Sequence, residues 1–275
     1  SPSLIDNQES ESSSTFSEEE WQRKNALRRR RLDLGLNYNF YLDLINNEFW
    51  KQHPSEKGRT LTNKPEDKEL RESWNTIATE MLEKLSFLSP EAIERMGSYN
   101  RDQRKSWKGE VNRLRLSSRA LYDLADAEFF HRFPEQENQK FIDQPIGQVW
   151  NAIIFDKIKA LQSGEAYERL IFTSDAIELK VNGTLKPGEG KAYVAQLNSD
   201  QLMDVKLKTD QKTFLSIYSP TGRVTILEDS QIRKWSGTLP EKGYYEFTIV
   251  SKAKKSLNYQ LDLTVQETET PPETI

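Results

Sequence analysis

The sequence predicts an α+β multidomain protein, in which an N-terminal all-α helical bundle is followed by an antiparallel, jelly-roll-like β-sandwich. In the first part of the chain, apolar residues recur with the period of a helix. In the last third they alternate with polar residues between tight turn signals. The clearest alternating run places one face of a strand at Tyr259, Leu261, Leu263 and Val265.

Composition limits the classes of function. The 275 residues carry a net charge of −4, with 35% hydrophobic and 30% charged residues, which predicts a lean core and a solvated surface. Basic residues are mixed with acidic ones along most of the chain, which argues against a duplex DNA partner. The absence of cysteine excludes disulfides and thiolate chemistry. The chain begins at Ser1 rather than at Met, and we expect it to be a piece of a longer protein.

Four segments are predicted. Residues 1–16 are Ser-rich and acidic, and residues 267–275 are similar, so we expect both to be disordered because they bury too little apolar surface. Residues 17–172 form the helical module and residues 173–266 the β-sandwich. The period changes between about Glu168 and Ile177. We therefore expect the two modules to be separable.

The helical module begins at Ser17, where Glu20 completes a capping box. A second helix is predicted from Pro65, a short one from Ser89 to Gly97, and a last one from Gln144 to a cap at Gly164. A long helix precedes the last one. The apolar stripe of the first helix is Leu34, Tyr38, Tyr41, Ile45 and Phe49. That of the second helix is Leu70, Trp74, Ile77, Met81 and Leu85. That of the long helix is Trp107, Val111, Leu114, Leu121, Ala125 and Phe129. Several such amphipathic helices with modest loops predict an all-α bundle.

The β-module is predicted to hold about eight short strands. The turn signals between them include Asn182-Gly183, Pro187 to Gly190, and Pro220 to Gly222. The predicted strands are residues 177–181, 193–197, 202–207, 214–218, 224–227, 235–239, 244–250 and 257–265. Short strands with turns every 8–12 residues are typical of a sandwich. Alternation places Tyr245, Phe247 and Ile249 in the core and Tyr244 on the opposite face.

The β-module resembles a bacterial pre-peptidase C-terminal domain. The motifs that carry this resemblance are Gly183 to Leu185, the strand from Tyr193 to Leu197, Phe214 to Gly222, Leu239-Pro240 with Gly243 to Tyr245, and Asn258 to Leu261. The resemblance implies a small jelly-roll-like sandwich of secreted and surface proteins, with a non-catalytic role. Lys212 and Thr213 stand where many members carry Asp, so an acidic ion site is not supported.

The helical module is similar to the region that follows the membrane span in some cyanobacterial eukaryotic-type Ser/Thr protein kinases. The strings that carry this similarity are Ala120 to Asp126 and Gln148 to Asn151. The kinase domain itself is absent, because the sequence contains no Gly-rich nucleotide loop, His-Arg-Asp or Asp-Phe-Gly.

Catalytic and metal motifs are not convincing. Glu128 and His131 have the spacing used in di-iron bundles, but a second such pair is missing, and we expect no metal site. The segment from Gly188 to Lys191 lacks the flanking residues of a phosphate loop and is interpreted as a hairpin turn. With two histidines and no Gly-x-Ser-x-Gly elbow, neither a Ser-His-Asp nor a Cys-His arrangement is supported. Paired carboxylates stay open, and a hydrolase would require a pocket with converging carboxylates of perturbed pKa.

The possible partner-binding residues are Arg28, Arg29, Arg30, Arg31, Trp50, His53 and Tyr244. The four arginines are interpreted as a solvated helix face, with contact to anionic lipid headgroups as the alternative. Trp50 lies at a helix end before His53 and is the tryptophan that we expect to be exposed. We therefore expect any peptide, lipid or protein surface to lie on the helical module near Trp50.

These observations lead to one main expectation and one alternative. We expect a non-catalytic sensory or protein-interaction region of a membrane-anchored signalling protein, namely the extracytoplasmic (periplasmic) part of a receptor-type Ser/Thr kinase. No cofactor is expected, and the partner is a protein, a peptide or a glycan. The alternative is a carbohydrate- or cell-wall-binding module of a secreted protein. A cytoplasmic location is the alternative to the periplasm.

Overall fold

The computed structural model describes residues 16–173 and 177–268. It confirms the α+β class, with α-helices in the first part of the chain and two largely antiparallel sheets in the last part. Contacts divide the chain into two compact units. We call residues 1–100 with 138–156 the helical unit, and residues 101–137 with 157–275 the mixed unit.

The helical unit is built around two long helices packed on a third. Both α2 and α3 contact α4, and a one-turn 3-10 helix precedes α4. The elements are α2 (Glu18–Leu34), α3 (Tyr38–Gln52), η1 (Pro54–Glu56), η2 (Pro65–Asp67), α4 (Lys68–Leu85) and α5 (Pro90–Glu94). Helix α8 (Pro145–Gln162) belongs to this unit as far as Asp156 and to the mixed unit from Lys157.

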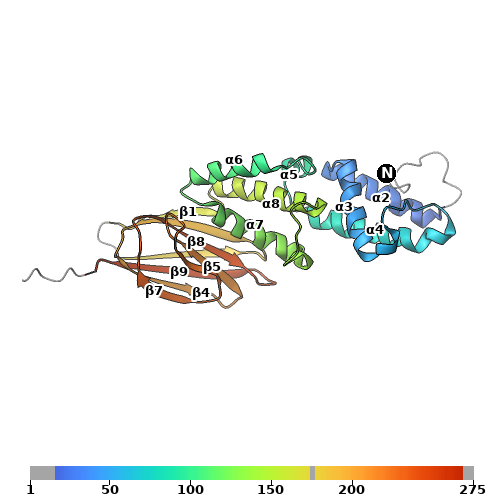
Figure 1. The fold of residues 1–275 in the computed structure, drawn as a ribbon. Helices are drawn as coiled ribbons and strands as arrows, with labels where there is room; N and C mark the ends of the chain where they lie inside the picture. Colours follow the sequence, from blue (N-terminus) through green and yellow to red (C-terminus); the bar gives the residue numbers. More distant parts are fainter. Residues whose placement is uncertain (1–15, 174–176, 269–275) are drawn as a thin grey trace, which may run out of the picture. The chain divides into compact units, whose positions relative to one another are not determined.

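The mixed unit contains two helices and a sandwich of two sheets (Figure 1). Its helical elements are α6 (Arg101–Asn112), α7 (Ser118–Arg132) and η3 (Pro134–Gln136). The five-stranded sheet has the order β1-β3-β8-β5-β6, formed by β1 (Tyr167–Leu170), β3 (Gly190–Leu197), β8 (Gly243–Ser251), β5 (Thr213–Tyr218) and β6 (Thr225–Ser230). The four-stranded sheet has the order β2-β9-β4-β7, formed by β2 (Glu178–Leu185), β9 (Leu257–Gln266), β4 (Leu202–Lys208) and β7 (Lys234–Thr238).

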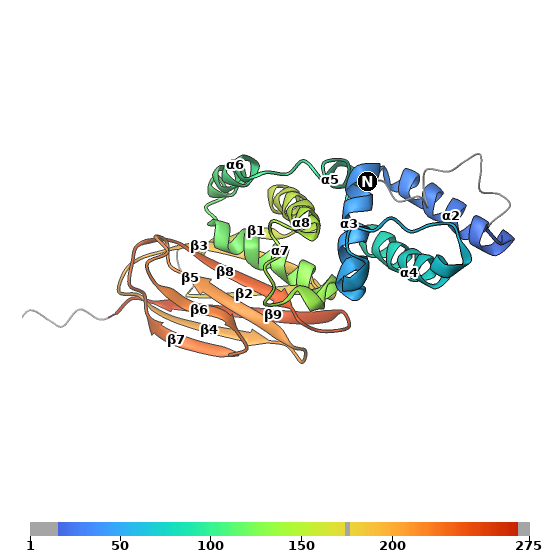
Figure 2. The ribbon, with the colours of Figure 1, turned by 45° about the vertical axis from the view of Figure 1, so that its right-hand side comes forward.

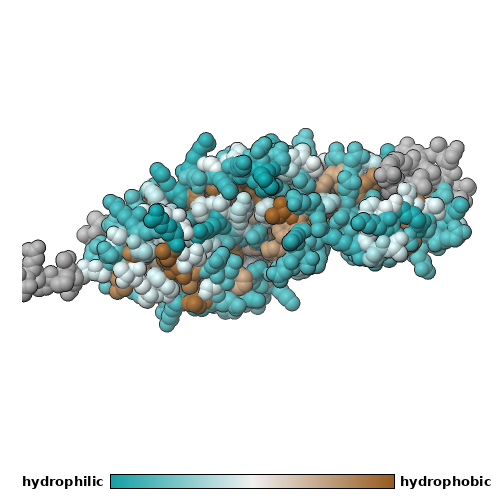
Figure 3. Space-filling view, viewed as in Figure 1, coloured by the Kyte–Doolittle hydropathy of each residue, from teal (hydrophilic) through white to brown (hydrophobic). Residues whose placement is uncertain are grey.

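The sandwich core lies between the inner faces of the two sheets. Tyr245, Phe247 and Ile249 are each 0% exposed and belong to this core, as the alternation predicts. The other face of β8 is also buried, because α7 packs on β8 and β3 (Figure 2). The strands β3 and β8 of the five-stranded sheet are therefore covered on both faces. Most of the surface in Figure 3 is hydrophilic, with small apolar patches on the sandwich.

Two predicted helices are each interrupted. The stripe from Leu34 to Phe49 lies on α2 and α3, which meet at Gly35 in the left-handed conformation, with φ 74°. The predicted long helix is likewise divided into α6 and α7, at Arg115 with φ 65°. A helix stripe alone does not reveal such a break, since the apolar spacing continues through it.

Two predictions in the β-module are also wrong. β2 runs straight through the predicted turn at Asn182-Gly183 and pairs with β9 up to Leu185. Gly183 is needed there because a Cβ atom would lie 2.3 Å from the Tyr259 ring. In addition, β1 lies inside the segment predicted as helical and pairs in parallel with β3. Four residues are too few for its alternation to be recognised.

The helical part contains an internal repeat that the helix stripes did not reveal. At a spacing of 80 residues, the identical pairs are Leu34 and Leu114, Leu36 and Leu116, Asp43 and Asp123, Leu44 and Leu124, Glu48 and Glu128, Phe49 and Phe129, Pro54 and Pro134, and Pro65 and Pro145. At a spacing of 76 residues, Trp74-Asn75 of α4 matches Trp150-Asn151 of α8, and Ile77 and Leu85 match Ile153 and Leu161. We call residues 18–85 the first repeat and residues 101–162 the second repeat.

The backbone repeats with the sequence. Gly35 and Arg115 share the left-handed conformation, and the next amide, Leu36 N or Leu116 N, donates over 3.2 Å to a carbonyl five residues earlier, at Arg31 or Val111. His53 and Phe133 end α3 and α7 with the same φ of −129° before a Pro-initiated 3-10 turn. These local structures follow the matched residues, so the two repeats have the same local architecture.

Candidate functional site

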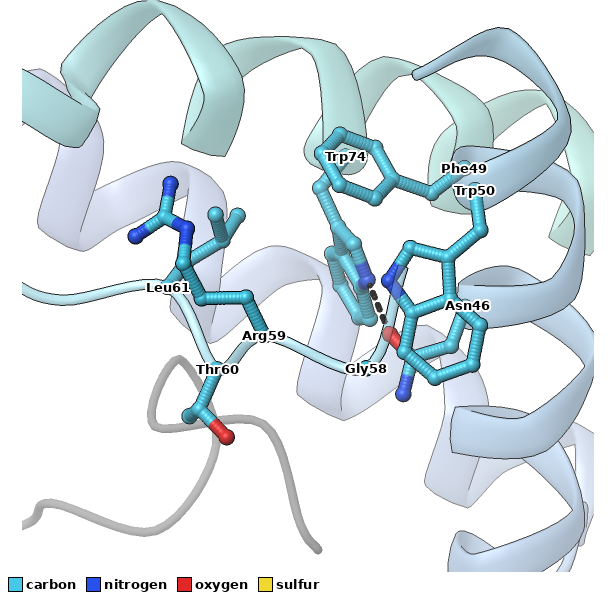
Figure 4. A pocket seen from close by; sticks show the side chains of 8 residues that line it. All are labelled: Asn46, Phe49, Trp50, Gly58, Arg59, Thr60, Leu61 and Trp74. Carbon is cyan, nitrogen blue, oxygen red and sulfur yellow. Dashed lines mark hydrogen bonds between the residues drawn. The ribbon is translucent and has the colours of Figure 1, made fainter. Parts of the chain in front are cut away.

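A small cavity lies beside Trp50 in the helical unit (Figure 4). It has a volume of about 120 Å³, and its walls come from α3, from the loop after η1 and from α4. The lining residues are Asn46, Phe49, Trp50, Gly58, Arg59, Thr60, Leu61 and Trp74. A volume of this size holds about four water molecules or one aliphatic side chain.

The periodicity of α3 positions one wall. Asn46, Phe49 and Trp50 are spaced i, i+3 and i+4 and so lie on one helix face. Phe49 is 1% exposed and anchors that face in the core, whereas Trp50 is half-buried. Trp74 Nε1 donates to Asn46 Oδ1 over 2.8 Å, which ties the α4 wall to the α3 wall. Trp74 also meets Tyr41 edge to face.

The loop wall is held by a network of charges. Arg59 makes a two-pronged contact to Asp67, at 3.0 and 2.9 Å, and the Thr62 amide and hydroxyl donate to the same carboxylate. The hydrogen bonds from Arg59 and Thr62 hold the pKa of Asp67 well below its usual range. Gly58 turns the chain with φ 78°. These contacts hold the loop in place, so this wall of the cavity is already formed before a ligand binds.

A buried ion pair fixes the same loop from the other side. Arg71 and Glu20 lie 2.6 Å apart with side chains only 3% and 7% exposed. The Arg71 guanidinium also donates to the carbonyls of Thr62 and Lys64, each over 2.7 Å. This one side chain therefore connects α2, the loop and α4.

The cavity combines apolar walls with unused donors. Among the described residues, no acceptor is bonded to Trp50 Nε1 or to Asn46 Nδ2. The indole rings of Trp50 and Trp74 can pack against an apolar side chain of a ligand. The N–H groups of Trp50 and Asn46 can donate to a carbonyl oxygen of the same ligand. Among the lining residues, none is a nucleophile paired with a base.

The predicted partner-binding residues do not form one site. Trp50 lines the cavity, but the His53 ring packs 4.7 Å from Phe49 and shares a hydrogen bond with Ser73 Oγ. Arg28, Arg29 and Arg30 are exposed on α2, while Arg31 is half-buried over Tyr38. Tyr244 lies in the mixed unit, where Arg115 and Arg169 flank its ring.

Most of the cavity lining carries no sequence signal. Arg59, Thr60 and Leu61 lie in a loop without regular period, and Trp74 lies on an apolar helix stripe that indicates packing rather than a site. No motif or regular spacing in the sequence marks these loop residues.

Two carboxylates of the mixed unit lie where α7 packs on the sheet: Asp123 of α7 is half-buried, and Glu246 of β8 is buried. Asp123 accepts hydrogen bonds from Tyr218 Oη at 2.5 Å and Thr248 Oγ1 at 2.9 Å, and burial raises its pKa to about 7. Glu246 accepts from the Ser117 amide at the start of α7, and burial raises its pKa too. Neither lines the Trp50 cavity. The partners of both carboxylates are hydroxyl and amide groups at the contact between α7 and the sheet. We therefore interpret the two carboxylates as residues that hold α7 on the sheet.

The Glu-x-x-His pair of α7 is held by cations. Arg132 and Lys157 lie 3.2 and 3.3 Å from the Glu128 carboxylate. Within residues 16–173 and 177–268, no cluster of three or more His, Asp or Glu side chains could hold a metal ion. None of the described helices is long and apolar enough to cross a bilayer.

The chain is similar to a Serine/threonine-protein kinase-like protein E of Synechocystis sp. (strain ATCC 27184 / PCC 6803 / Kazusa). The two are 33% identical over 253 residues, which is 88% of this chain but 41% of that protein. The similarity to cyanobacterial kinase proteins is thus confirmed over most of the chain, and the chain spans about two fifths of its relative's length. No family model matches the sequence.

Solved structures resemble only part of the chain. A periplasmic inhibitor of g-type lysozyme from Aeromonas hydrophila is 17% identical, with a TM-score of 0.34, over 37% of this chain and 96% of the inhibitor. The pre-peptidase C-terminal domain of a collagenase from Bacillus anthracis is 11% identical, with a TM-score of 0.29, over 36% of this chain and 94% of that domain. The latter belongs to the family that the β-module motifs resemble.

Proposed function

We propose that this chain is a non-catalytic protein-interaction region of a signalling protein, and that the Trp50 cavity receives one apolar side chain of a peptide partner. The observation that carries the proposal is the pairing of two indole walls with the unused donors Trp50 Nε1 and Asn46 Nδ2. The kinase-like relative supports the signalling context.

The expected affinity contribution is modest. Burying one Val, Leu or Ile side chain contributes about 1.5 to 3 kcal/mol, or roughly ten- to a hundredfold in Kd. The ordered loop limits the entropy cost of binding, because Arg59 and Arg71 already hold it in place. A carbonyl of the ligand accepting from either free donor would fix the direction of the peptide.

The test is a selection on the full chain with a displayed heptapeptide library and, in parallel, a glycan array. We expect peptides with a central Leu, Ile, Val or Pro, and at least about a tenfold loss of binding in Trp50→Ala. Phe130→Ala is the matched control, since Phe130 is the counterpart of Trp50 in the second repeat, and it should bind normally. Selection of glycans alone, or peptides indifferent to Trp50→Ala, would show that this cavity is not a peptide site.

The location forms a second part of the proposal. We propose that the chain belongs to the extracytoplasmic part of a membrane-anchored kinase, which is supported by its similarity to part of a kinase-like protein. Protease digestion of intact spheroplasts that express the whole native protein tests this. Loss of an epitope placed after Gln266 is expected, and its survival until the membrane is opened would place the region in the cytoplasm.

A further inference from the structure

The third helices of the two repeats differ on one face. At a spacing of 76 residues, Thr76, Thr79 and Glu80 of α4 match Ala152, Phe155 and Asp156 of α8. The three α4 residues are exposed, whereas Ala152 and Phe155 are 0% and 8% exposed and Asp156 is half-buried. The neighbouring matched pair, Trp74 and Trp150, is buried in both helices. The difference is therefore confined to one stripe.

A preceding segment contacts this stripe on α8. Ser89 donates from its amide and its hydroxyl to the Asp156 carboxylate, at 2.8 and 2.6 Å. The ring of Tyr99 lies 6.4 Å from that of Phe155, and the Arg95 guanidinium lies 5.0 Å above the same ring. All of these residues belong to the helical unit. Residues 89–99, which include α5, thus cover this face of α8. The matching face of α4 is exposed.

The Gln148 side chain completes this contact. Its carbonyl accepts from the amides of Gly97 and Tyr99, at 2.9 and 3.0 Å, and its amide group donates to the Tyr99 carbonyl. In the first repeat the matching residue is Glu72.

On the first repeat, the same stripe lines a groove of about 490 Å³ between α2 and α4. Its lining includes Ala26 and Leu27 of α2 and Asn75 and Thr79 of α4. Asn75 is 6% exposed, and its Oδ1 atom has no hydrogen-bond partner in the described part of the chain. A buried acceptor without a donor is costly, so this atom indicates a missing polar contact.

The rims of the groove carry opposite charges. Arg23 and Arg30 line the α2 side and Glu72 and Glu80 the α4 side. The α6 positions that match Arg23 and Arg30 are Gln103 and Glu110, so the basic rim is particular to the first repeat. An occupant should therefore combine acidic side chains with donors of the kind that Ser89 offers to Asp156.

We propose that the chain's own N-terminal segment, Ser1–Glu11, docks in the groove between α2 and α4. Its sequence supports the assignment, since Ser1, Pro2 and Ile5 have the order and spacing of Ser89, Pro90 and Ile93. The acidic residues Asp6, Glu9 and Glu11 follow and complement Arg23 and Arg30. Ser1–Glu11 lies outside the described residues, so the proposal rests on its sequence and on the groove.

The connection is long enough. Residues 12–17, which follow the docked segment, can span up to about 20 Å when extended, and Arg23 and Arg30 lie about 9 and 20 Å along α2 from Ser17. The end of the segment at Glu11 can therefore reach the basic rim of the groove. This docking is independent of the Trp50 cavity, which has no lining residue in common with the groove.

Engineered disulfides in the full chain test the proposal. The native sequence has no cysteine, so Ile5→Cys/Thr76→Cys creates one defined pair across the groove. The control is Ile5→Cys/Arg28→Cys, because Arg28 lies on α2 outside the groove lining. Docking raises the effective concentration above that of a free linker, and we expect the groove pair to oxidise at least about tenfold faster than the control.

A second measurement separates docking from chance encounters. In the same chain, Arg23→Glu/Arg30→Glu should bring the rate of the groove pair down to that of the control, because the acidic segment then meets a repelling rim. Equal rates for the two pairs in the unmodified background would overturn the proposal. So would a groove pair whose faster rate is unchanged by the charge reversal.

Discussion

The two repeats share a local structure but differ in what covers them. The first repeat lies wholly in the helical unit, whereas the second has α6 and α7 in the mixed unit and most of α8 in the helical unit. In the first repeat Asp43 is exposed, while its counterpart Asp123, on α7, is half-buried against β5 and β8. The same helix pattern thus supports an open surface in one copy and a packing surface in the other. The uncovered copy is where binding should be sought.

The largest expected effect comes from a contact that only the first repeat has. Arg71 has Gly147 at its matched position in α8, so the buried pair with Glu20 has no counterpart there. Arg71→Ala should lower the free energy of unfolding by about 3 to 5 kcal/mol, because Glu20 stays buried without its cation. Urea unfolding measures this, and Glu20→Gln/Arg71→Met should recover much of the loss. A loss below about 1 kcal/mol would mean that the pair does not hold the loop.

The covered stripe on α8 provides a second comparison. Phe155→Ala should cost about 3 kcal/mol in unfolding free energy, because a buried ring is lost beneath Tyr99 and Arg95. Thr79→Ala, at the matched position of α4, should cost about 0.5 kcal/mol or less, since Thr79 is exposed. Similar losses of unfolding free energy in the two variants would contradict the inference that this face is covered on α8 and exposed on α4.

The third comparison uses pH. The folded pKa of Asp123 is about 7, against an unperturbed value of 3.8. Below pH 3.8 the carboxyl is neutral in both states; between pH 4 and 7 the folded chain keeps the proton that the unfolded chain releases. The free energy of unfolding should therefore fall over that range, on the order of 1.4 kcal/mol per pKa unit, and level off above it.

The variants Asp123→Asn and Asp43→Asn separate the two copies. The first should reduce that fall, with the remainder due to Glu246 and Asp229, whose pKa values burial also raises, and the second should leave it in place, because Asp43 is exposed. Burial is the main cause of the raised pKa of Asp123, and the charges of Asp229 and Asp126 also raise it. Denaturant titrations from pH 4 to 8 provide the measurement. An unchanged pH profile in Asp123→Asn would assign the dependence to other groups.

The smallest effects concern the left-handed turns. Gly58 has φ 78°, and its counterpart Asn138 has φ 63°. Gly58→Asn should change the unfolding free energy by less than about 0.5 kcal/mol, whereas Gly58→Val should cost at least about 1 kcal/mol because a β-branched residue resists this conformation. A thermal melt compares the two, and equal melting temperatures would show that the turn relaxes.

Sequence patterns predicted the elements that have a regular period or a capping residue. Ser17 and Ser89 begin helices as expected, and the buried face of β9 is the predicted one. The patterns failed where contacts between residues distant in the sequence determine the local structure. Arg115 breaks a helix without a glycine, and Gly183 sits within a strand because the Tyr259 ring needs the space. Trp50 was found from its place at a helix end, but its neighbours Arg59 and Thr60 come together only through the fold.

Because α7 covers one face of the five-stranded sheet, the position of a recombination junction decides whether that face stays buried when the sandwich moves to another gene. A recombination event at residue 173 would separate the sandwich from β1 and from the helix over Ala192, Val194 and Thr248. The transplanted sandwich would then carry a bare apolar face and be prone to self-association. A single junction before Arg101 would carry α7, β1 and the sandwich together and keep that face protected. The natural module for shuffling is therefore larger than the β-sandwich and includes half of the helical repeat.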